Sequence, residues 1–167
     1  MRALAVELAS RIREDLPGRE LFAVTHSLGG IVVRCMSDAL PWRGVVMIAP
    51  PNNGSRVAAA LGGLPAYRWF YGDAGQEMRR EGDWPAPPTP FAVIAGTRGL
   101  SPTNPVSWLT SAARLFPVGV AHDGTVAVEE TRYAGMTSFD TVDADHTWIM
   151  NHPDVQKLVL RFLATHR

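Results

Sequence analysis

Apolar positions along this chain occur either at helical spacing or in short continuous runs. Residues 4–16 carry Leu or Ile at every fourth position, with Ala5 and Ala9 beside them, which predicts an amphipathic helix whose apolar face they form. Helical spacing of apolar residues also covers 31–40, which Pro41 closes. A last helix is expected to start at Pro153, because five apolar residues follow it on one helical face.

Four short runs have the character of strands: 21–24, 45–49, 91–95 and the less apolar 138–142. The first three lack polar alternation, which is typical of strands buried on both faces of a parallel sheet. Strands that alternate with helices imply right-handed crossovers, with helices on both sides of the sheet. We therefore expect an α/β fold, with a mostly parallel sheet flanked by helices, in a single domain spanning residues 1–167.

The pattern weakens between the second and third runs, over 62–90. An aromatic cluster (Tyr67, Trp69, Phe70 and Tyr71), a short charged helix over 77–81 and a proline-rich stretch from Trp84 to Pro88 follow one another. We interpret this segment as an excursion from the sheet. Its aromatic side chains would form a lid or acyl-pocket wall, or pack the excursion against the body, or form an association surface. Short helices are also expected over 57–61, capped by Ser55, and over 108–115.

Composition narrows the function classes. Sixteen Lys and Arg balance sixteen Asp and Glu, so the surplus of positive charge that nucleic-acid partners require is missing. The single cysteine, Cys35, excludes an internal disulfide framework and a cysteine-based zinc site, and is expected to be a core thiol. No apolar run approaches the ~18 residues of a transmembrane segment, and the first residues do not resemble a signal peptide. We expect a cytoplasmic protein.

The candidate chemistry begins where the first strand enters the following helix, at Thr25-His26-Ser27-Leu28-Gly29. A serine at a sharp strand-to-helix turn presents its hydroxyl at the carboxyl edge of the sheet. The helix N-terminus favours developing negative charge there, and the Leu28 N–H can donate to an oxyanion. Thr25 stands where G-x-S-x-G has its first glycine, and a threonine fits there if the neighbouring strand leaves space for its side chain. The plainer alternative makes Ser27 a helix N-cap. We interpret His26 as a packing residue in preference to a second base.

A nucleophilic serine needs a histidine base oriented by a carboxylate, in the chain order Ser, acid, His for this architecture. Asp123 lies in an Asp-Gly turn after the third strand, and His146 follows the fourth strand. Asp123 could alternatively serve an ordinary turn. The rival side chains are the acids Asp140, Asp143 and Asp145, interpreted as solvated loop residues, and the histidines His122, interpreted as a neighbour of the acid, and His152, interpreted as a helix-start residue.

A metal site is a further alternative, because Asp143, Asp145 and His146 carry suitable ligand atoms. Their spacing is not that of a recognisable ligand set. We therefore expect neither a metal nor a cofactor.

With these segments the chain resembles the lipase/esterase branch of the α/β-hydrolase family. Four motifs occur in the family's order: V-T-H-S-L-G-G at 24–30, A-P-P-N-N-G-S at 49–55, H-D-G-T-V-A-V at 122–128 and D-H-T-W-I-M at 145–150. The resemblance covers nearly the whole chain. It implies Ser27 as nucleophile, Asp123 as acid and His146 as base, acting on a small-molecule or lipid-like carboxylic ester. We expect short to medium acyl chains, because the sequence shows no extended apolar lid.

The chain departs from the family in what precedes the nucleophile strand. The family has several strands and an oxyanion loop there, whereas one helix precedes the strand here. We expect a truncated, minimal α/β-hydrolase fold in which the strand at 21–24 is an edge with an uncovered apolar face. Self-association into a homo-oligomer through that edge would cover it. The second oxyanion donor has no evident source in the sequence.

Two alternative functions remain. The same triad could serve a thioesterase, amidase or acyltransferase, which a panel of esters, thioesters and amides would separate. A catalytically silent interaction module is the other alternative, which a fluorophosphonate probe would separate from an enzyme.

Overall fold

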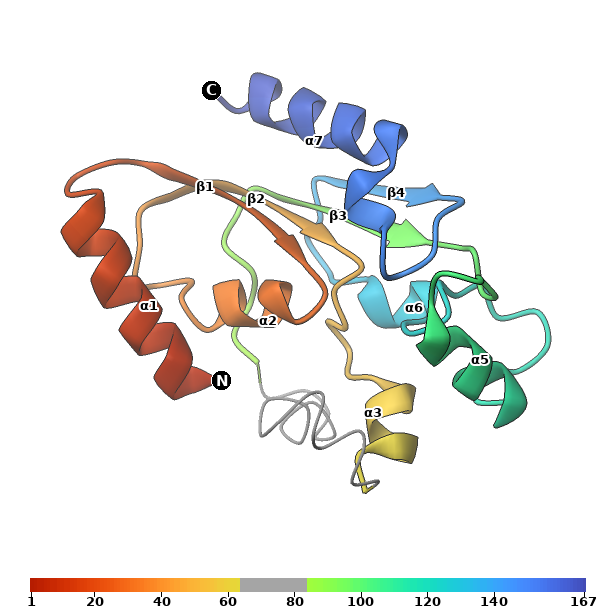
Figure 1. The fold of residues 1–167 in the computed structure, drawn as a ribbon. Helices are drawn as coiled ribbons and strands as arrows, with labels where there is room; N and C mark the ends of the chain where they lie inside the picture. Colours follow the sequence, from red (N-terminus) through yellow and green to blue (C-terminus); the bar gives the residue numbers. More distant parts are fainter. Residues whose placement is uncertain (64–83) are drawn as a thin grey trace.

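Four parallel strands form the centre of the computed structural model, which describes residues 1–63 and 84–167 (Figure 1). In the order in which they lie across the sheet, they are β1 (Leu21–His26), β2 (Trp42–Ile48), β3 (Phe91–Gly96) and β4 (Ser138–Val142). Each neighbouring pair is parallel. The carboxyl ends of all four strands therefore lie at the same end of the sheet. Candidate catalytic residues follow β1 and β4 there.

Helices cover both faces of this sheet. The helices are α1 (Arg2–Asp15), α2 (Leu28–Arg34), α3 (Arg56–Leu61), α5 (Pro105–Ala112), α6 (Val128–Thr131), the 3₁₀ helix η1 (Ile149–Asn151) and α7 (Pro153–Thr165). Figure 1 shows α7 on one face and α1, α2 and α6 on the other. The predicted α/β class, with a parallel sheet flanked by helices, is confirmed.

Alternate residues of the central strands enter two separate cores. Beneath α7, Val46 and Ile48 of β2 pack with Phe162. On the opposite face, Val45 and Met47 of the same strand pack in the core that contains residues of α1 and α2. The continuous apolar runs of β2 and β3 thus reflect burial on both faces.

The predicted face of α1 is partly wrong. Ala5 and Ala9 are fully buried, whereas Leu4, Leu8 and Leu16 are exposed. Small side chains at the contact let α1 lie close to α2, because the distance between packed helices depends on the side chains between them. The leucines one position earlier point about a quarter turn away from that contact.

Helix α2 is shorter than its apolar spacing predicts. It ends at Arg34, and residues 35–39 form turns instead of continuing the helix. Its last full turn contains Ile31, Val32 and Val33, which are β-branched and weak helix formers. Cys35 is half-buried against the core on the α1 side, as expected of a core thiol.

Strand β1 lies at the edge of the sheet and is not buried on both faces. Among the described residues, it pairs with β2. Val24 is beside Val46 in the register, so it points toward the α7 face, yet it is 48% exposed. The expected sheet edge is therefore present in the described part of the chain, with an apolar side chain open to solvent.

The shorter expected elements have mixed outcomes. Ser55 caps α3 by accepting a hydrogen bond from the Ala58 N–H at 3.1 Å, as predicted. Helix α5 starts at Pro105, earlier than expected, and α6 was not foreseen. The aromatic cluster and the charged helix of the excursion lie outside the described residues. In the described ranges, no helix combines the length and the apolar character that crossing a membrane requires.

Candidate active site

Ser27 occupies a strained turn between β1 and α2. Its backbone has φ 51° and ψ −124°, a left-handed conformation that costs a residue other than glycine about 1–3 kcal/mol. The Ser27 N–H donates to the Ile48 carbonyl at 2.8 Å, which fixes the turn against β2. Ser27 is the N-cap residue of α2 by position, but its hydroxyl makes no capping hydrogen bond to the helix, so side-chain capping does not explain this serine.

The turn depends on glycine on its helix side. A Cβ added to Gly29 would lie 3.4 Å from the Cβ of Thr25, and one added to Gly30 would lie 3.0 Å from the Cβ of Pro50. Thr25 therefore fits where the usual pattern has glycine because Gly29 faces it.

Three side chains distant in sequence converge on this turn. The His146 Nε2 lies 3.0 Å from the Ser27 Oγ, and the His146 Nδ1 lies 2.7 Å from Asp123 Oδ2. Ser27 follows the end of β1, Asp123 lies in the connection between β3 and β4, and His146 lies in the loop after β4. The structure thus brings together the three residues that the sequence singled out. The order Ser–His–Asp is that of a proton relay from a hydroxyl to an imidazole that a carboxylate orients.

The Asp-Gly turn fixes the position of the Asp123 carboxylate. Its Oδ1 accepts hydrogen bonds from the Thr125 and Val126 N–H groups at 2.9 and 2.7 Å, which leaves Oδ2 for His146. Gly124 has φ 91°, and a Cβ there would lie 2.6 Å from the Ser107 Cβ and 2.7 Å from the Gly99 carbonyl oxygen. Asp123 is 1% exposed, so this carboxylate meets protein groups in place of water.

No protein-family model matches the sequence, and no curated protein matches it. Among solved structures, the mature Bacillus licheniformis lipase BlEst2 is similar with a TM-score of 0.72 at 19% identity, over 97% of this chain and 74% of that chain. The metagenomic carboxyl esterase MGS0156 is similar with a TM-score of 0.58 at 17% identity, over 87% of this chain and 49% of that one. The monoacylglycerol lipase of Paleococcus ferrophilus has a TM-score of 0.51 at 18% identity, over 99% and 76%.

The chain has an α/β-hydrolase fold. It spans 39% of the propeptide form of the Bacillus lipase and about half of the metagenomic esterase. At these identities the similarity establishes the fold, and the reaction must be argued from the site itself. In an α/β-hydrolase fold, a strained serine turn at the carboxyl end of a strand is where a nucleophile is expected.

The expectation that all three rival acids are solvated loop residues is wrong for Asp145. It is buried at 6% exposure and is not a solvated loop residue. Its Oδ2 accepts hydrogen bonds from the Ser101 and Thr103 hydroxyls at 2.9 and 3.0 Å, and its Oδ1 accepts one from the Thr147 N–H at 3.0 Å. Burial opposes ionisation of this carboxyl, but the hydrogen bonds outweigh it and lower its pKa. Asp145 therefore fixes the loop that carries His146 without contacting the imidazole.

The other rival side chains have partners elsewhere. Asp143 is exposed and pairs with Arg98 at 3.0 Å. His152 is the N-cap of α7, where its Nδ1 accepts a hydrogen bond from the Asp154 N–H at 3.3 Å, as a helix-start residue should. His122 stacks on Phe116 with ring centroids 3.9 Å apart, and burial lowers its pKa.

One contact of the candidate site was not foreseen. The His26 Nε2 lies 2.9 Å from the backbone carbonyl oxygen of His146, and the two rings are 4.8 Å apart at 44°. Burial, and next the charge of His146, lower the pKa of His26 to about 4. The sequence placed His26 next to the nucleophile but carried no signal for which loop it would meet.

The metal site that the sequence offered as an alternative is not formed in the described part of the chain. Within the described ranges, no group of three His, Cys, Asp or Glu side chains is placed to hold a metal ion. Asp145 and His146 are turned toward different partners, so the set that we weighed as a metal site does not converge.

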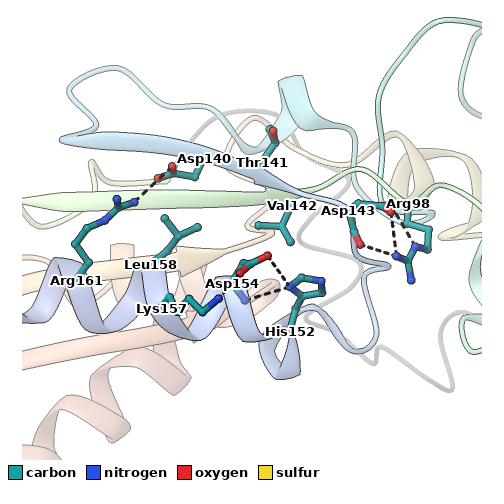
Figure 2. A pocket seen from close by; sticks show the side chains of 10 residues that line it. All are labelled: Arg98, Asp140, Thr141, Val142, Asp143, His152, Asp154, Lys157, Leu158 and Arg161. Atoms are coloured by element: carbon teal, nitrogen blue, oxygen red, sulfur yellow. Dashed lines mark hydrogen bonds and ion pairs between the residues drawn. The ribbon is translucent and has the colours of Figure 1, made fainter.

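A charged pocket lies apart from the serine turn. It has a volume of about 590 Å³ between the end of β4 and the start of α7, and Figure 2 shows its lining residues, Arg98, Asp140, Thr141, Val142, Asp143, His152, Asp154, Lys157, Leu158 and Arg161. Its acids and bases pair with one another: Arg98 with Asp143, Lys157 with Asp154, and Arg161 with Asp140. None of the converging side chains lines it, so the candidate site of this α/β-hydrolase fold is at the serine turn.

Proposed function

We propose that this chain is a serine hydrolase that cleaves carboxylic esters through an acyl-enzyme. The observation that carries the proposal is the hydrogen-bonded line from the Ser27 Oγ through the His146 ring to Asp123, with steps of 3.0 and 2.7 Å. It is supported by the left-handed backbone of Ser27, because strained conformations cluster at catalytic positions. An interaction module without activity would have no need for such a line.

Each residue has a distinct part in the proposed reaction. The Ser27 Oγ attacks the acyl carbon, and its proton passes to the His146 Nε2. His146 then gives that proton to the departing alcohol, and the same ring activates the water that hydrolyses the acyl-enzyme. Asp123 keeps the proton of the neutral ring on Nδ1 and stabilises the charged ring.

The oxyanion is assigned to the Leu28 N–H. Leu28 is the first residue of α2, and the first N–H groups of a helix have no partners within the helix. This N–H follows the nucleophile directly in sequence, which is the usual position of one oxyanion donor in this fold. One donor is typically worth ~10²–10³ in rate, so this contribution is substantial on its own.

Esters with short to medium acyl chains are the proposed substrates. Three similar structures, all of which share the fold, are named as a lipase, a carboxyl esterase and a monoacylglycerol lipase. The chemistry proposed for the triad requires no metal or cofactor.

A fluorophosphonate probe tests the proposal directly. We expect the native protein to form a phosphonyl adduct on Ser27, located by peptide mass spectrometry, and the Ser27→Ala variant to form none. Turnover measured on matched esters, thioesters and amides then identifies the leaving group, with esters expected to be fastest. A folded native protein that does not react with the probe contradicts the proposal and favours a silent module.

We also propose that the chain self-associates through the β1 edge. The backbone N–H and C=O groups on the outer side of β1 have no strand partner in the described residues, and Val24 is 48% exposed beside them. Exposed apolar side chains also lie on α1, the helix that leads into β1. An open, apolar edge is a template for pairing with another strand.

Sedimentation of matched variants tests the association. We expect the native chain to sediment as an oligomer, and Val24→Lys to shift it to monomer, because a charge on an edge strand opposes pairing. The matched control is Leu160→Lys, which places the same charge at an exposed leucine of α7 and should leave the oligomer intact. A native protein that is monomeric throughout a concentration series refutes the association.

A further inference from the structure

All four polar groups of His146 are bound by residues of the candidate site. Its N–H donates to the Asp123 carbonyl at 3.0 Å, and its ring nitrogens contact Asp123 Oδ2 and the Ser27 Oγ. Its carbonyl oxygen is bound by the His26 Nε2 at 2.9 Å. Asp123 therefore holds both backbone and ring on one side, while the end of β1 holds both on the other. His26 is the member of this set without a part in the proposed reaction.

We propose that His26 is a positioning residue, which ties the loop of His146 to the nucleophile turn and so sets the placement of the His146 ring against Ser27. This inference rests on the proposed function. His26 immediately precedes Ser27, so the bond connects the nucleophile and the base through one side chain. A hydroxyl and an imidazole must meet at hydrogen-bond distance for proton transfer, and small misplacement is costly.

The chemistry of the contact fixes the state of the His26 ring. A backbone carbonyl oxygen only accepts hydrogen bonds, so the His26 Nε2 must carry a proton. The titratable groups that act on His26 are His146 and Asp123, and burial together with the charge of His146 holds its pKa near 4. Above that pH the ring is neutral with the proton on Nε2. It therefore keeps the bond without adding a positive charge beside His146 when His146 takes the serine proton.

A pair of His26 variants separates the hydrogen bond from the bulk of the ring. His26→Leu removes the donor, and His26→Gln restores an N–H near the position of Nε2. We expect His26→Leu to lower kcat for an ester by about 10–100-fold with little change in KM, because the ring of His146 is misplaced while the binding surface is untouched. His26→Gln should recover most of this loss. Equal loss in both variants, or no loss in His26→Leu, overturns the inference.

A double-mutant cycle distinguishes positioning from stability. In a His146→Ala background the backbone carbonyl remains but the ring is gone. His26→Leu should then leave the residual kcat unchanged, while it lowers the thermal midpoint in both backgrounds. If His26→Leu lowers kcat by the same factor with and without the ring, His26 does not act through His146, and the inference is wrong.

A measurement that does not need activity keeps the two proposals apart. In ¹⁵N-histidine NMR spectra of the native chain, His26 should be neutral with its proton on Nε2 at pH 7 and should stay neutral to below pH 5. A chain that reacts with a fluorophosphonate but has the His26 proton on Nδ1 refutes the positioning role alone. A chain with the expected signal that neither reacts nor hydrolyses esters refutes the proposed function, and with it any role in catalysis for His26.

Discussion

Replacing Ser27 with alanine is expected to lower kcat for ester hydrolysis by about 10⁴–10⁶-fold. The substitution removes the one oxygen that can form the acyl-enzyme, and loss of a triad serine typically has an effect of this size. Steady-state kinetics on the best ester of the panel measures it, with circular dichroism of both proteins to show that the fold persists. Residual turnover within tenfold of the native rate would show that another group carries the reaction.

Glycine at the same position should separate activity from strain. Alanine keeps a Cβ at φ 51° and ψ −124°, whereas glycine adopts this conformation freely. Relief of strain is worth ~1–3 kcal/mol and is partly offset by the extra unfolded-state freedom of glycine, ~0.5–1 kcal/mol.

We therefore expect Ser27→Gly to be inactive but more stable than Ser27→Ala by about 1 kcal/mol, which corresponds to a thermal midpoint about 2–4 °C higher. Thermal unfolding of the two variants side by side is the measurement. If the glycine variant is the less stable of the two, the turn stores no strain at Ser27.

The central strands of the sheet could be predicted from the sequence, because a buried strand has a continuous apolar run that is visible locally. The runs at 45–49 and 91–95 predicted the presence of β2 and β3, since a strand buried on both faces needs apolar residues at every position, although β2 begins three residues earlier, at Trp42. The face of α1 was not readable to the same degree. Leucine and alanine stripes lie side by side on this helix, and which of them is buried depends on how closely α2 approaches.

The candidate site was predictable as far as motifs and chain order carry it. Ser27, Asp123 and His146 could be chosen because each follows a predicted strand in the order that the chemistry needs. The contacts that position these three residues could not be predicted, because those contacts join loops far apart in sequence. Asp145 illustrates this, since only the folded chain brings Ser101 and Thr103 to its carboxylate.

Asp123→Asn is expected to lower kcat by about 10⁴-fold while leaving the turn in place. Its Oδ1 can still accept the Thr125 and Val126 N–H groups, so the side chain keeps its position. The amide nitrogen then faces the His146 Nδ1 and donates to it, which moves the ring proton to Nε2. A ring with its proton on Nε2 cannot accept the proton of Ser27, and an Asp-to-Asn change of this kind costs ~10⁴ in kcat in a triad.

Asp145→Asn is the matched control for this prediction. It makes the same change in the residue adjacent to His146, at a carboxylate that is also buried but turned toward Ser101 and Thr103. Asp145→Asn should lower the free energy of unfolding by ~1–3 kcal/mol, because it weakens a buried set of hydrogen bonds. It should retain far more of the native kcat than Asp123→Asn does, when both variants are assayed well below their unfolding transitions. Comparable loss of kcat in the two variants would mean that Asp123 is not the acid. A large loss in Asp123→Asn alone assigns the acid to Asp123, because the two carboxylates differ in which of them contacts the imidazole.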